Sequence, residues 1–293
     1  MVLLDILEAN GIREIDIMGG EPLILPWMPD FVANAIKKQL TVNISTNGAD
    51  TKAISGFRHI DPDRCSIGIS LQGSNAELHN SITHSSHFAA AVRSIQWLVS
   101  CGLDPIVKTV LTRRNAHDIQ QIVTLLKGLG VKKYYLIHMD LMSRDESLKE
   151  DASGFVGFEW YYRKTKKANP DMGVFKVHAS CFSRKLISAG VRCAGGVRKL
   201  SILPDGSVFP CNLFHGFDEF NLGNIFKDDF SVIWNNPVLE RFRKYRGNKC
   251  EMDGCTHRTS CTGGCPAHGY YHYRETERMD IRCTLSHRPL DFA

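Results

Sequence analysis

The sequence predicts an α/β protein in which a parallel sheet with helical crossovers is followed by a cysteine-rich region. Two observations lead to this fold class. Between residues 2 and 140, short β-rich runs alternate with amphipathic helices, the pattern of right-handed βαβ units and a parallel sheet. Eight of the ten cysteines lie between Cys181 and Cys283, beyond that alternating part.

Length and composition exclude several classes of protein. The 293 residues are enough for one large domain, or a large domain and a small one. The formal charge of +5 comes from dispersed basic residues, so no nucleic-acid partner is expected. No apolar run approaches the roughly 20 residues of a membrane helix, and the first ten residues carry two acids and no basic segment. We therefore expect a cytoplasmic protein without a signal peptide or a membrane contact.

Each predicted element of the first part has its own sequence signal. The helix over residues 2–10 ends at Asn10–Gly11, and the helix over 88–100 is closed by Gly102. Two more helices are predicted over 27–38 and 117–129, and five strands over 12–18, 40–45, 64–71, 103–111 and 132–139. Because the chain starts with a helix, a strand that would ordinarily precede it is absent.

Beyond residue 140 the pattern changes. A polar stretch leads to an aromatic helix around residues 155–167, and residues 199–211 predict a hairpin whose arms are joined by Pro204–Asp205–Gly206. Residues 230–245 predict a helix with a break near Pro237. We therefore predict a sheet domain over residues 1–140, a connecting helical segment over 141–180 and a cysteine-rich domain over 181–293.

The cysteines of the last domain are spaced like metal ligands. Their pattern is Cys193-x17-Cys211, then Cys250-x4-Cys255-x5-Cys261-x3-Cys265-x17-Cys283. The segment is too poor in apolar residues to fold by packing alone, which indicates that metal stabilises it. Iron–sulfur clusters and structural zinc both take four cysteines, but the paired C-x2-C knuckles usual for zinc do not occur. The spacing favours iron–sulfur, with zinc and a set of buried reduced cysteines as alternatives.

The hairpin with Cys193-x12-Gly206-x4-Cys211, the CTGGC stretch and the last cysteine resemble the SPASM domain of radical S-adenosylmethionine enzymes. The resemblance covers residues 193–283 and departs from the family where Cys250-x4-Cys255 replaces C-x2-C. It implies two auxiliary [4Fe–4S] clusters with interleaved ligands: Cys193, Cys211 and Cys265 on one, and Cys250, Cys255, Cys261 and Cys283 on the other. Cys181 is the candidate fourth ligand of the first cluster, which otherwise keeps an open iron site.

The sequence GGEP at residues 19–22 follows the strand predicted over 12–18. Two glycines there let the backbone approach a ligand, and Glu21 can accept a hydrogen bond from an ammonium group, although an ordinary βα turn has the same composition. Beside the cysteine-rich domain, this motif resembles the GGEP of radical S-adenosylmethionine enzymes, which holds the amino group of the methionine moiety.

Two further motifs, STNG at 45–48 and ISLQG at 69–73, extend this resemblance to residues 2–140, although the family often has Asp where Gln72 stands. It implies a partial (β/α)6 TIM-like barrel without its first strand, with its site at the carboxyl ends of the strands. It also implies five cofactor-binding residues: Gly19, Gly20, Glu21, Asn47 and Ser70.

One motif of that family, the CxxxCxxC that holds the catalytic [4Fe–4S] cluster, does not occur in the sequence. Cys65 and Cys101 lie in or beside later elements and are expected to be core residues. Without three clustered thiolates, the chain is expected to be unable to form a 5′-deoxyadenosyl radical. Two explanations are open: an N-terminally truncated form of a normal enzyme, which we favour, and a degenerate, non-catalytic paralogue.

The resemblance implies a peptide- or protein-modifying maturase that abstracts a hydrogen atom and oxidises the product radical through auxiliary clusters. Its implied partners are a peptide or protein substrate and a reductant such as flavodoxin or ferredoxin. Sulfatase-maturing relatives have an Asp base after the cysteine that closes the hairpin, whereas Asn212 stands there in this chain and argues against that branch. No residue is assigned a catalytic role. The alternatives are an iron–sulfur binding or electron-transfer protein and a zinc-stabilised peptide-binding module.

Overall fold

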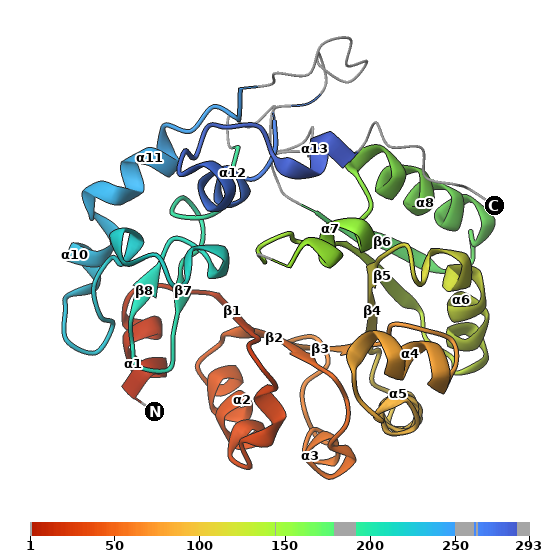
Figure 1. Cartoon of the computed structure of the whole chain (residues 1–293). Helices are drawn as coiled ribbons and strands as arrows, with labels where there is room; N and C mark the ends of the chain where they lie inside the picture. Colours follow the sequence, from red (N-terminus) through yellow and green to blue (C-terminus); the bar gives the residue numbers. More distant parts are fainter. Residues whose placement is uncertain (1, 144, 179–191, 250–260, 262, 286–293) are drawn as a thin grey trace. The chain divides into compact units, whose positions relative to one another are not determined.

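The computed structural model describes residues 2–143, 145–178, 192–249, 261 and 263–285 (Figure 1). The chain divides into two compact units. The first contains the residues up to His138 together with Phe158–Val177, and the second contains Met139–Gly157 and the residues from His178 onwards. The segment over 141–180 is therefore shared between the two units.

The first unit is built on a six-stranded parallel sheet whose strands follow one another in sequence order. Its strands are β1 (Glu14–Ile17), β2 (Thr41–Thr46), β3 (Cys65–Ser70), β4 (Ile106–Leu111), β5 (Lys133–His138) and β6 (Gly173–Val177). Its helices are α1 (Val2–Ala9), α2 (Met28–Lys37), α3 (Thr51–Ser55), α4 (Ala76–Thr83), α5 (Phe88–Ser100), α6 (Ile119–Gly128) and α8 (Phe155–Ala168), with the 3-10 turns η1 (Pro22–Ile24) and η2 (Ala116–Asp118). This is the predicted α/β architecture of a partial barrel.

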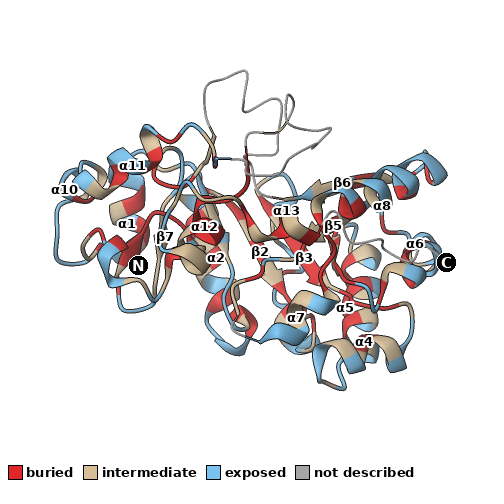
Figure 2. Cartoon of the chain, turned by 45° about the horizontal axis from the view of Figure 1, so that its top comes forward, coloured by how far each residue is buried: buried red, intermediate tan, exposed pale blue. Residues whose placement is uncertain are grey.

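Helices cover one face of this sheet. In Figure 1 the helices α2 to α6 follow the outer side of the curved sheet. Along β2 and β4 every second residue is buried, and these residues pack with apolar side chains of α2, α5 and α6 in one core. Figure 2 shows the buried residues along the strands and exposed residues on the outer surfaces of the helices. The alternate residues form the opposite face, which we call the inner face.

One strand and one detail of the core differ from the sequence prediction. The five predicted strands are present, but β6 was not predicted, because GVFKV is short, follows a polar stretch and borders only β5 in the sheet. Cys65 lies in the core as predicted, and burial raises the pKa of its thiol to about 12. Cys101 follows α5 and is half-buried rather than part of the core.

The second unit consists of short elements. The predicted hairpin is formed by β7 (Ser201–Ile202) and β8 (Val208–Phe209), with Gly206 at a φ of +88° in its turn. Helical pieces are α7 (Glu146–Asp151), η4 (Asn212–Phe214), η5 (Asp218–Phe220), α10 (Phe230–Trp234), η6 (Pro237–Leu239), α11 (Glu240–Arg243), α12 (Pro266–Tyr273) and α13 (Ile281–Leu285). The break predicted near Pro237 is confirmed, because η6 separates α10 from α11.

Aromatic rings take the place of a large aliphatic core in part of this unit. Phe214 packs against Phe220 at 4.3 Å between ring centroids and against Phe242 at 5.1 Å. Tyr270 of α12 meets Phe220 edge to face at 4.7 Å. Such pairs add about 0.5–1.5 kcal/mol each beyond the burial of their surface. Within the described residues, no helix has the length and apolar character needed to cross a membrane.

His79 of α4 makes the stability of the first unit depend on pH. Its side chain is 3% exposed, and its Nδ1 accepts a hydrogen bond from the backbone N–H of Gln72 at 3.0 Å. Burial, aided by repulsion from His87, lowers the pKa of His79 to about 4. An unfolded histidine has a pKa of about 6.5, so this contribution is complete above that pH and is lost as the pH falls towards 4.

We expect His79→Gln to reduce, by about 1 kcal/mol, the loss in unfolding free energy that the wild-type protein shows between pH 7 and pH 5. Urea denaturation at both pH values measures the difference. His59→Gln, at an exposed histidine, is the matched control and should leave the pH dependence unchanged. An identical loss in wild type and His79→Gln would contradict the assignment.

Candidate functional site

The loop after β1 presents bare backbone at the carboxyl edge of the sheet. Gly19 has a φ of +142°, a region that favours glycine. A Cβ atom added at Gly19 or at Gly20 would meet nothing within 4 Å. The backbone of these two residues therefore lies open, and a ligand can approach it without meeting a side chain.

Glu21 connects this loop to the loop after β2. Its Oε2 accepts a hydrogen bond from the backbone N–H of Asn47 at 2.7 Å, and its Oε1 accepts from the Thr46 hydroxyl at 2.6 Å. The backbone N–H of Leu23 donates to the same Oε1 at 3.1 Å. A carboxylate offers about four acceptor positions, so these three bonds leave room for about one more donor. The structure thus brings together Gly19, Gly20, Glu21 and Asn47, four of the five predicted cofactor residues.

Ser70, the fifth, ends β3 and is half-buried on the inner face. Gln72, which follows it, has a structural role: its side-chain Oε1 accepts from the backbone N–H of Val110 at 3.0 Å. Asn115 reinforces the same place, because its Nδ2 donates to the carbonyls of Gln72 and Val110 at 3.2 and 3.0 Å. These side chains hold the ends of β3 and β4 together beside Ser70.

Three cysteines of the second unit lie close to one another. A Cβ atom added at Gly195 would lie 3.5 Å from both the Sγ of Cys193 and the Cβ of Cys211. Burial, with a smaller contribution from the neighbouring Cys193, raises the pKa of Cys211 to about 11. Burial also raises the pKa of Cys265, with a further contribution from Cys211 and Cys193. These are the three residues that the sequence assigns to one auxiliary cluster.

The chemistry of this donor set fits an iron–sulfur cluster. Buried neighbouring thiols oppose each other's ionisation, and binding of a cluster replaces their protons and stabilises the thiolates. A cluster is several ångströms wide, so its ligands do not converge on one point. The described residues contain no group of three or more His, Cys, Asp or Glu placed to hold a single metal ion.

The second predicted ligand set is described only in part. Cys261 and Cys283 are half-buried. Cys250 and Cys255 lie outside the described residues, as does Cys181, the candidate fourth ligand of the first cluster. For these three residues the assignment stays a prediction.

A buried charge network supports Cys265, and the sequence analysis missed it. Asp280 and Arg282 are fully buried, and Arg282 donates to both carboxylate oxygens of Asp280, from Nε at 3.0 Å and from a terminal nitrogen at 2.8 Å. The backbone N–H of Cys265 donates to Oδ2 of Asp280 at 2.8 Å, and Nδ1 of the buried His268 lies 3.1 Å from it. Although burial opposes ionisation, Arg282 holds the pKa of Asp280 well below its usual range.

Gly264 permits this contact. A Cβ atom added there would lie 1.8 Å from the Cβ of Asp280, so only glycine fits. The sequence signals for this contact are the two glycines of CTGGC and the DIRC sequence at 280–283. Neither signal by itself predicts that Gly264 packs against Asp280.

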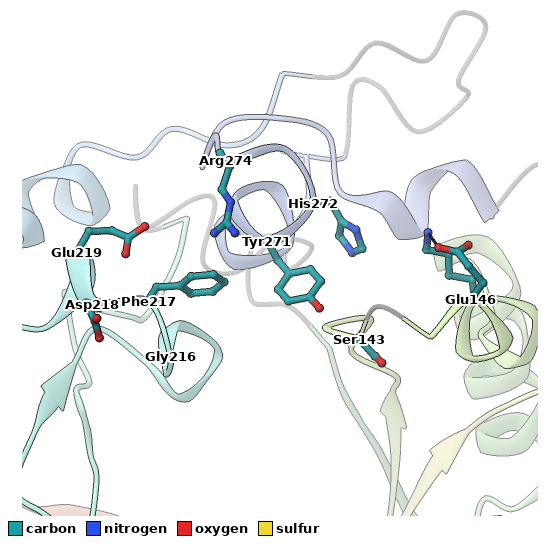
Figure 3. Close-up of a pocket in the computed structure, with 10 residues that line it drawn as sticks. Ser143, Glu146, Gly216, Phe217, Asp218, Glu219, Tyr271, His272 and Arg274 are labelled. Carbon is teal, nitrogen blue, oxygen red and sulfur yellow. Dashed lines mark hydrogen bonds and ion pairs between the residues drawn. The ribbon is translucent and has the colours of Figure 1, made fainter.

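A surface pocket of about 670 Å³ also lies in the second unit (Figure 3). Phe217, Tyr271 and Arg274 line it, and the Arg274 guanidinium stands 5.3 Å from the centroid of the Phe217 ring. Lys149 and Glu146, which also line it, form an ion pair at 2.6 Å. None of the site residues predicted from the sequence lines this pocket.

Two known families match the chain. Residues 2–126 match the radical SAM superfamily, and residues 193–262 match SPASM, an iron-sulfur cluster-binding domain. The first match covers the sheet edge with Gly19, Gly20 and Glu21, and the second covers Cys193 and Cys211.

Curated relatives extend over nearly the whole chain. The mycofactocin maturase MftC of Mycobacterium tuberculosis is 26% identical over 293 residues, which cover 97% of this chain and 74% of that protein. The antilisterial bacteriocin subtilosin biosynthesis protein AlbA of Bacillus subtilis is 27% identical over 270 residues, covering 89% of this chain and 58% of that protein.

Solved structures share the fold. SuiB of Streptococcus suis bound to S-adenosylmethionine matches with a TM-score of 0.77 and 15% identity, over 97% of this chain and 69% of that chain. The enzyme anSMEcpe with bound AdoMet matches with a TM-score of 0.72 and 16% identity, over 97% of this chain and 83% of that chain.

We expect Asp280→Asn to destabilise the protein by about 3–5 kcal/mol, because it leaves the buried Arg282 without its countercharge. Chemical denaturation of the metal-free protein measures this loss. Glu275→Gln, at an exposed acid of the same unit, is the matched control and should change the free energy of unfolding by less than about 0.5 kcal/mol. Equal stability of the two variants would show that the network is not needed for folding.

Proposed function

The chain belongs to the radical SAM superfamily and carries a SPASM domain, and on this premise we propose that it is a maturase that modifies a peptide or protein. One observation carries the proposal: the chain has open backbone at Gly19 and Gly20 beside loops that Glu21 links, and it also has three neighbouring cysteines, two of them buried. The first feature suits the methionine end of S-adenosylmethionine, and the second suits an iron–sulfur cluster.

The proposed roles of the sheet edge follow from its geometry. The backbone of Gly19 and Gly20 lies against the cofactor, and the remaining acceptor position of Glu21 takes a hydrogen from its ammonium group. Asn47, held by Glu21, and Ser70, at the end of β3, border the same ligand.

The proposed roles of the cysteines follow the two ligand sets. Cys193, Cys211 and Cys265 hold one [4Fe–4S] cluster, with Cys181 as its fourth ligand. The other cluster is held by Cys250, Cys255, Cys261 and Cys283. When bound, S-adenosylmethionine would supply the 5′-deoxyadenosyl group for radical chemistry if a reduced catalytic cluster gave it an electron, and the clusters held by these cysteines would offer sites that can take up an electron.

The proposed partners are a precursor peptide or protein and a reductant such as flavodoxin or ferredoxin. SuiB has been solved bound to the precursor peptide SuiA, MftC is named a maturase and AlbA is named for the biosynthesis of a bacteriocin, and these relatives support a peptide substrate here. The reducing cytoplasm is the compartment that keeps ten cysteines available to iron. Asn212, at the start of η4, argues against sulfatase maturation despite the shared fold with anSMEcpe.

A second candidate rests on the missing motif. Since CxxxCxxC does not occur in these 293 residues, we propose that they alone do not cleave S-adenosylmethionine. A chain that keeps only the auxiliary clusters would be an iron–sulfur binding or electron-transfer protein. This candidate and the maturase differ in whether 5′-deoxyadenosine is formed from S-adenosylmethionine.

After anaerobic reconstitution we expect about eight iron atoms per chain, four for each cluster, with matching sulfide. Cys211→Ser should lower the iron content towards about four, because the first cluster loses a ligand. Cys65→Ser, at a core cysteine, is the matched control and should leave iron unchanged. Bound zinc without sulfide would rule out both iron–sulfur functions.

With S-adenosylmethionine and dithionite, we expect the reconstituted 293-residue chain to form no 5′-deoxyadenosine above the background of a protein-free sample. Chromatography of the quenched reaction measures the product. Steady formation of 5′-deoxyadenosine by this chain would refute the claim that it lacks radical chemistry by itself, and would favour the maturase over the electron-transfer protein.

A further inference from the structure

A row of four side-chain positions crosses the inner face of the sheet. Ser70 of β3 pairs in register with Lys108 of β4, Lys108 with Tyr135 of β5, and Tyr135 with Phe175 of β6. The strands carry these labels in Figure 1. Residues in register on adjacent strands point to the same face, so one row holds a hydroxyl, an ammonium and two aromatic rings. Hydroxyl and ammonium side chains are costly on a face that is not in contact with water or a ligand.

The position of the ammonium is fixed by two neighbours. Lys108 Nζ donates a hydrogen bond to the Ser45 hydroxyl on β2 at 2.7 Å. To reach it, the side chain crosses β3 at Gly68, where an added Cβ would lie 2.3 Å from Cε and 2.6 Å from Nζ of Lys108. Because Gly68 has no side chain, the Lys108 side chain has room to lie flat across β3 at this position.

The charge of Lys108 is not neutralised by an ion pair within the part of the chain that the structure describes: no carboxylate there lies within 4.0 Å of its Nζ. Asp16 of β1 acts on it only from a greater distance and itself accepts a hydrogen bond from Asn43 at 2.8 Å. An ammonium has three donors, and Ser45 takes one. Burial lowers the pKa of Lys108, which shows that its charged form is held at a cost.

An aromatic surface lies on the same face, on the other side of β4 from the ammonium. The rings of Tyr135 and Phe175 stack with centroids 5.0 Å apart and planes inclined by 28°. Phe175 is 41% exposed although it lies in the sheet. A cation and an exposed ring pair that share one face, separated by the width of β4, are suited to a ligand that joins an anionic group to an apolar or aromatic one.

We propose that Lys108 binds a carboxylate on the inner face, and that Tyr135 and Phe175 contact an apolar or aromatic group attached to it. The carboxylate belongs to the peptide substrate, either a chain terminus or an acidic side chain beside an aromatic residue, and this identification rests on the proposed function. The methionine carboxylate of S-adenosylmethionine is the other source of the same chemistry, because Ser70, a proposed cofactor residue, is the register partner of Lys108.

The first test compares N-acetyl-L-tyrosine with N-acetyl-L-tyrosinamide, two probes that share the ring and differ in the carboxylate. In NMR titrations of the reconstituted full chain, we expect the acid to bind at least about tenfold more tightly than the amide. Lys108→Met and Lys108→Gln should abolish this preference. Lys132→Met, at an exposed lysine just before β5, is the matched control and should keep it. Circular dichroism and thermal unfolding show which of the two Lys108 variants is correctly folded, and that variant is used for the titration.

A second variant tests whether the position of the Lys108 charge matters as well as its presence. Gly68→Ala keeps the ammonium but displaces it from Ser45, so it should lose the preference for the acid as Lys108→Met does. The double variant Gly68→Ala/Lys108→Met should lose no more than Lys108→Met alone, because both changes remove one interaction. Additive losses would show that Gly68 acts elsewhere.

The third titration identifies the source of the carboxylate, using S-adenosylmethionine and its decarboxylated analogue. If the cofactor supplies the carboxylate, Lys108→Met weakens binding of S-adenosylmethionine by about tenfold to a hundredfold and leaves the analogue unchanged. If the peptide supplies it, binding of both cofactors is unchanged and only N-acetyl-L-tyrosine loses affinity. The proposal is overturned if Lys108→Met or Lys108→Gln, correctly folded, weakens neither carboxylate. The N-acetyl-L-tyrosine titration needs no radical chemistry, so failure of the proposed function would be seen separately, in the iron and 5′-deoxyadenosine assays.

Discussion

Among the described residues of the first unit, helices pack on one face of the parallel sheet, and this constraint guides where ligands can bind in that unit. The covered face is filled by alternate residues of the strands and by apolar residues of α2, α5 and α6. The inner face and the loops at the carboxyl edge then offer positions for polar side chains outside this apolar core. Both places are used: Glu21 joins the loops after β1 and β2, and Lys108 reaches Ser45 across the inner face.

The second unit follows a different physical principle. Its short elements leave little aliphatic core, and packed rings and a fully buried ion pair organise it instead. A buried ion pair contributes little net stability, because removing both charges from water costs about as much as their attraction returns. Its value here is positional. Asp280 accepts from the backbone N–H of Cys265 and thereby fixes a predicted cluster ligand relative to α13.

The two units thus carry complementary chemistry. The first offers open backbone at the carboxyl edge of the sheet and an inner face that carries Lys108, and the second offers neighbouring thiols whose pKa is raised by burial. Relatives at identities near one quarter have names that point to different products, among them a mycofactocin maturase, a bacteriocin biosynthesis protein and AdoMet-dependent heme synthases. At such low sequence identity, proteins share a fold more readily than a substrate. Substrate specificity depends on a few side chains, and those of the inner face are candidates here.

The sequence by itself determined the elements with a strong local signal. Sequence patterns predicted α1, α2, α5 and α6, with glycine stops after α1, α5 and α6, and the GGEP and cysteine spacings pointed to both cofactors. Only the tertiary structure decided three other features: the strand β6, the contact of Asp280 with Cys265 and the path of Lys108 over Gly68. Each depends on atoms far apart in the chain, 63 residues in the case of Lys108 and Ser45. Local propensity carries no information on such a pairing, because it arises from the register of neighbouring strands and from the space that a missing side chain leaves.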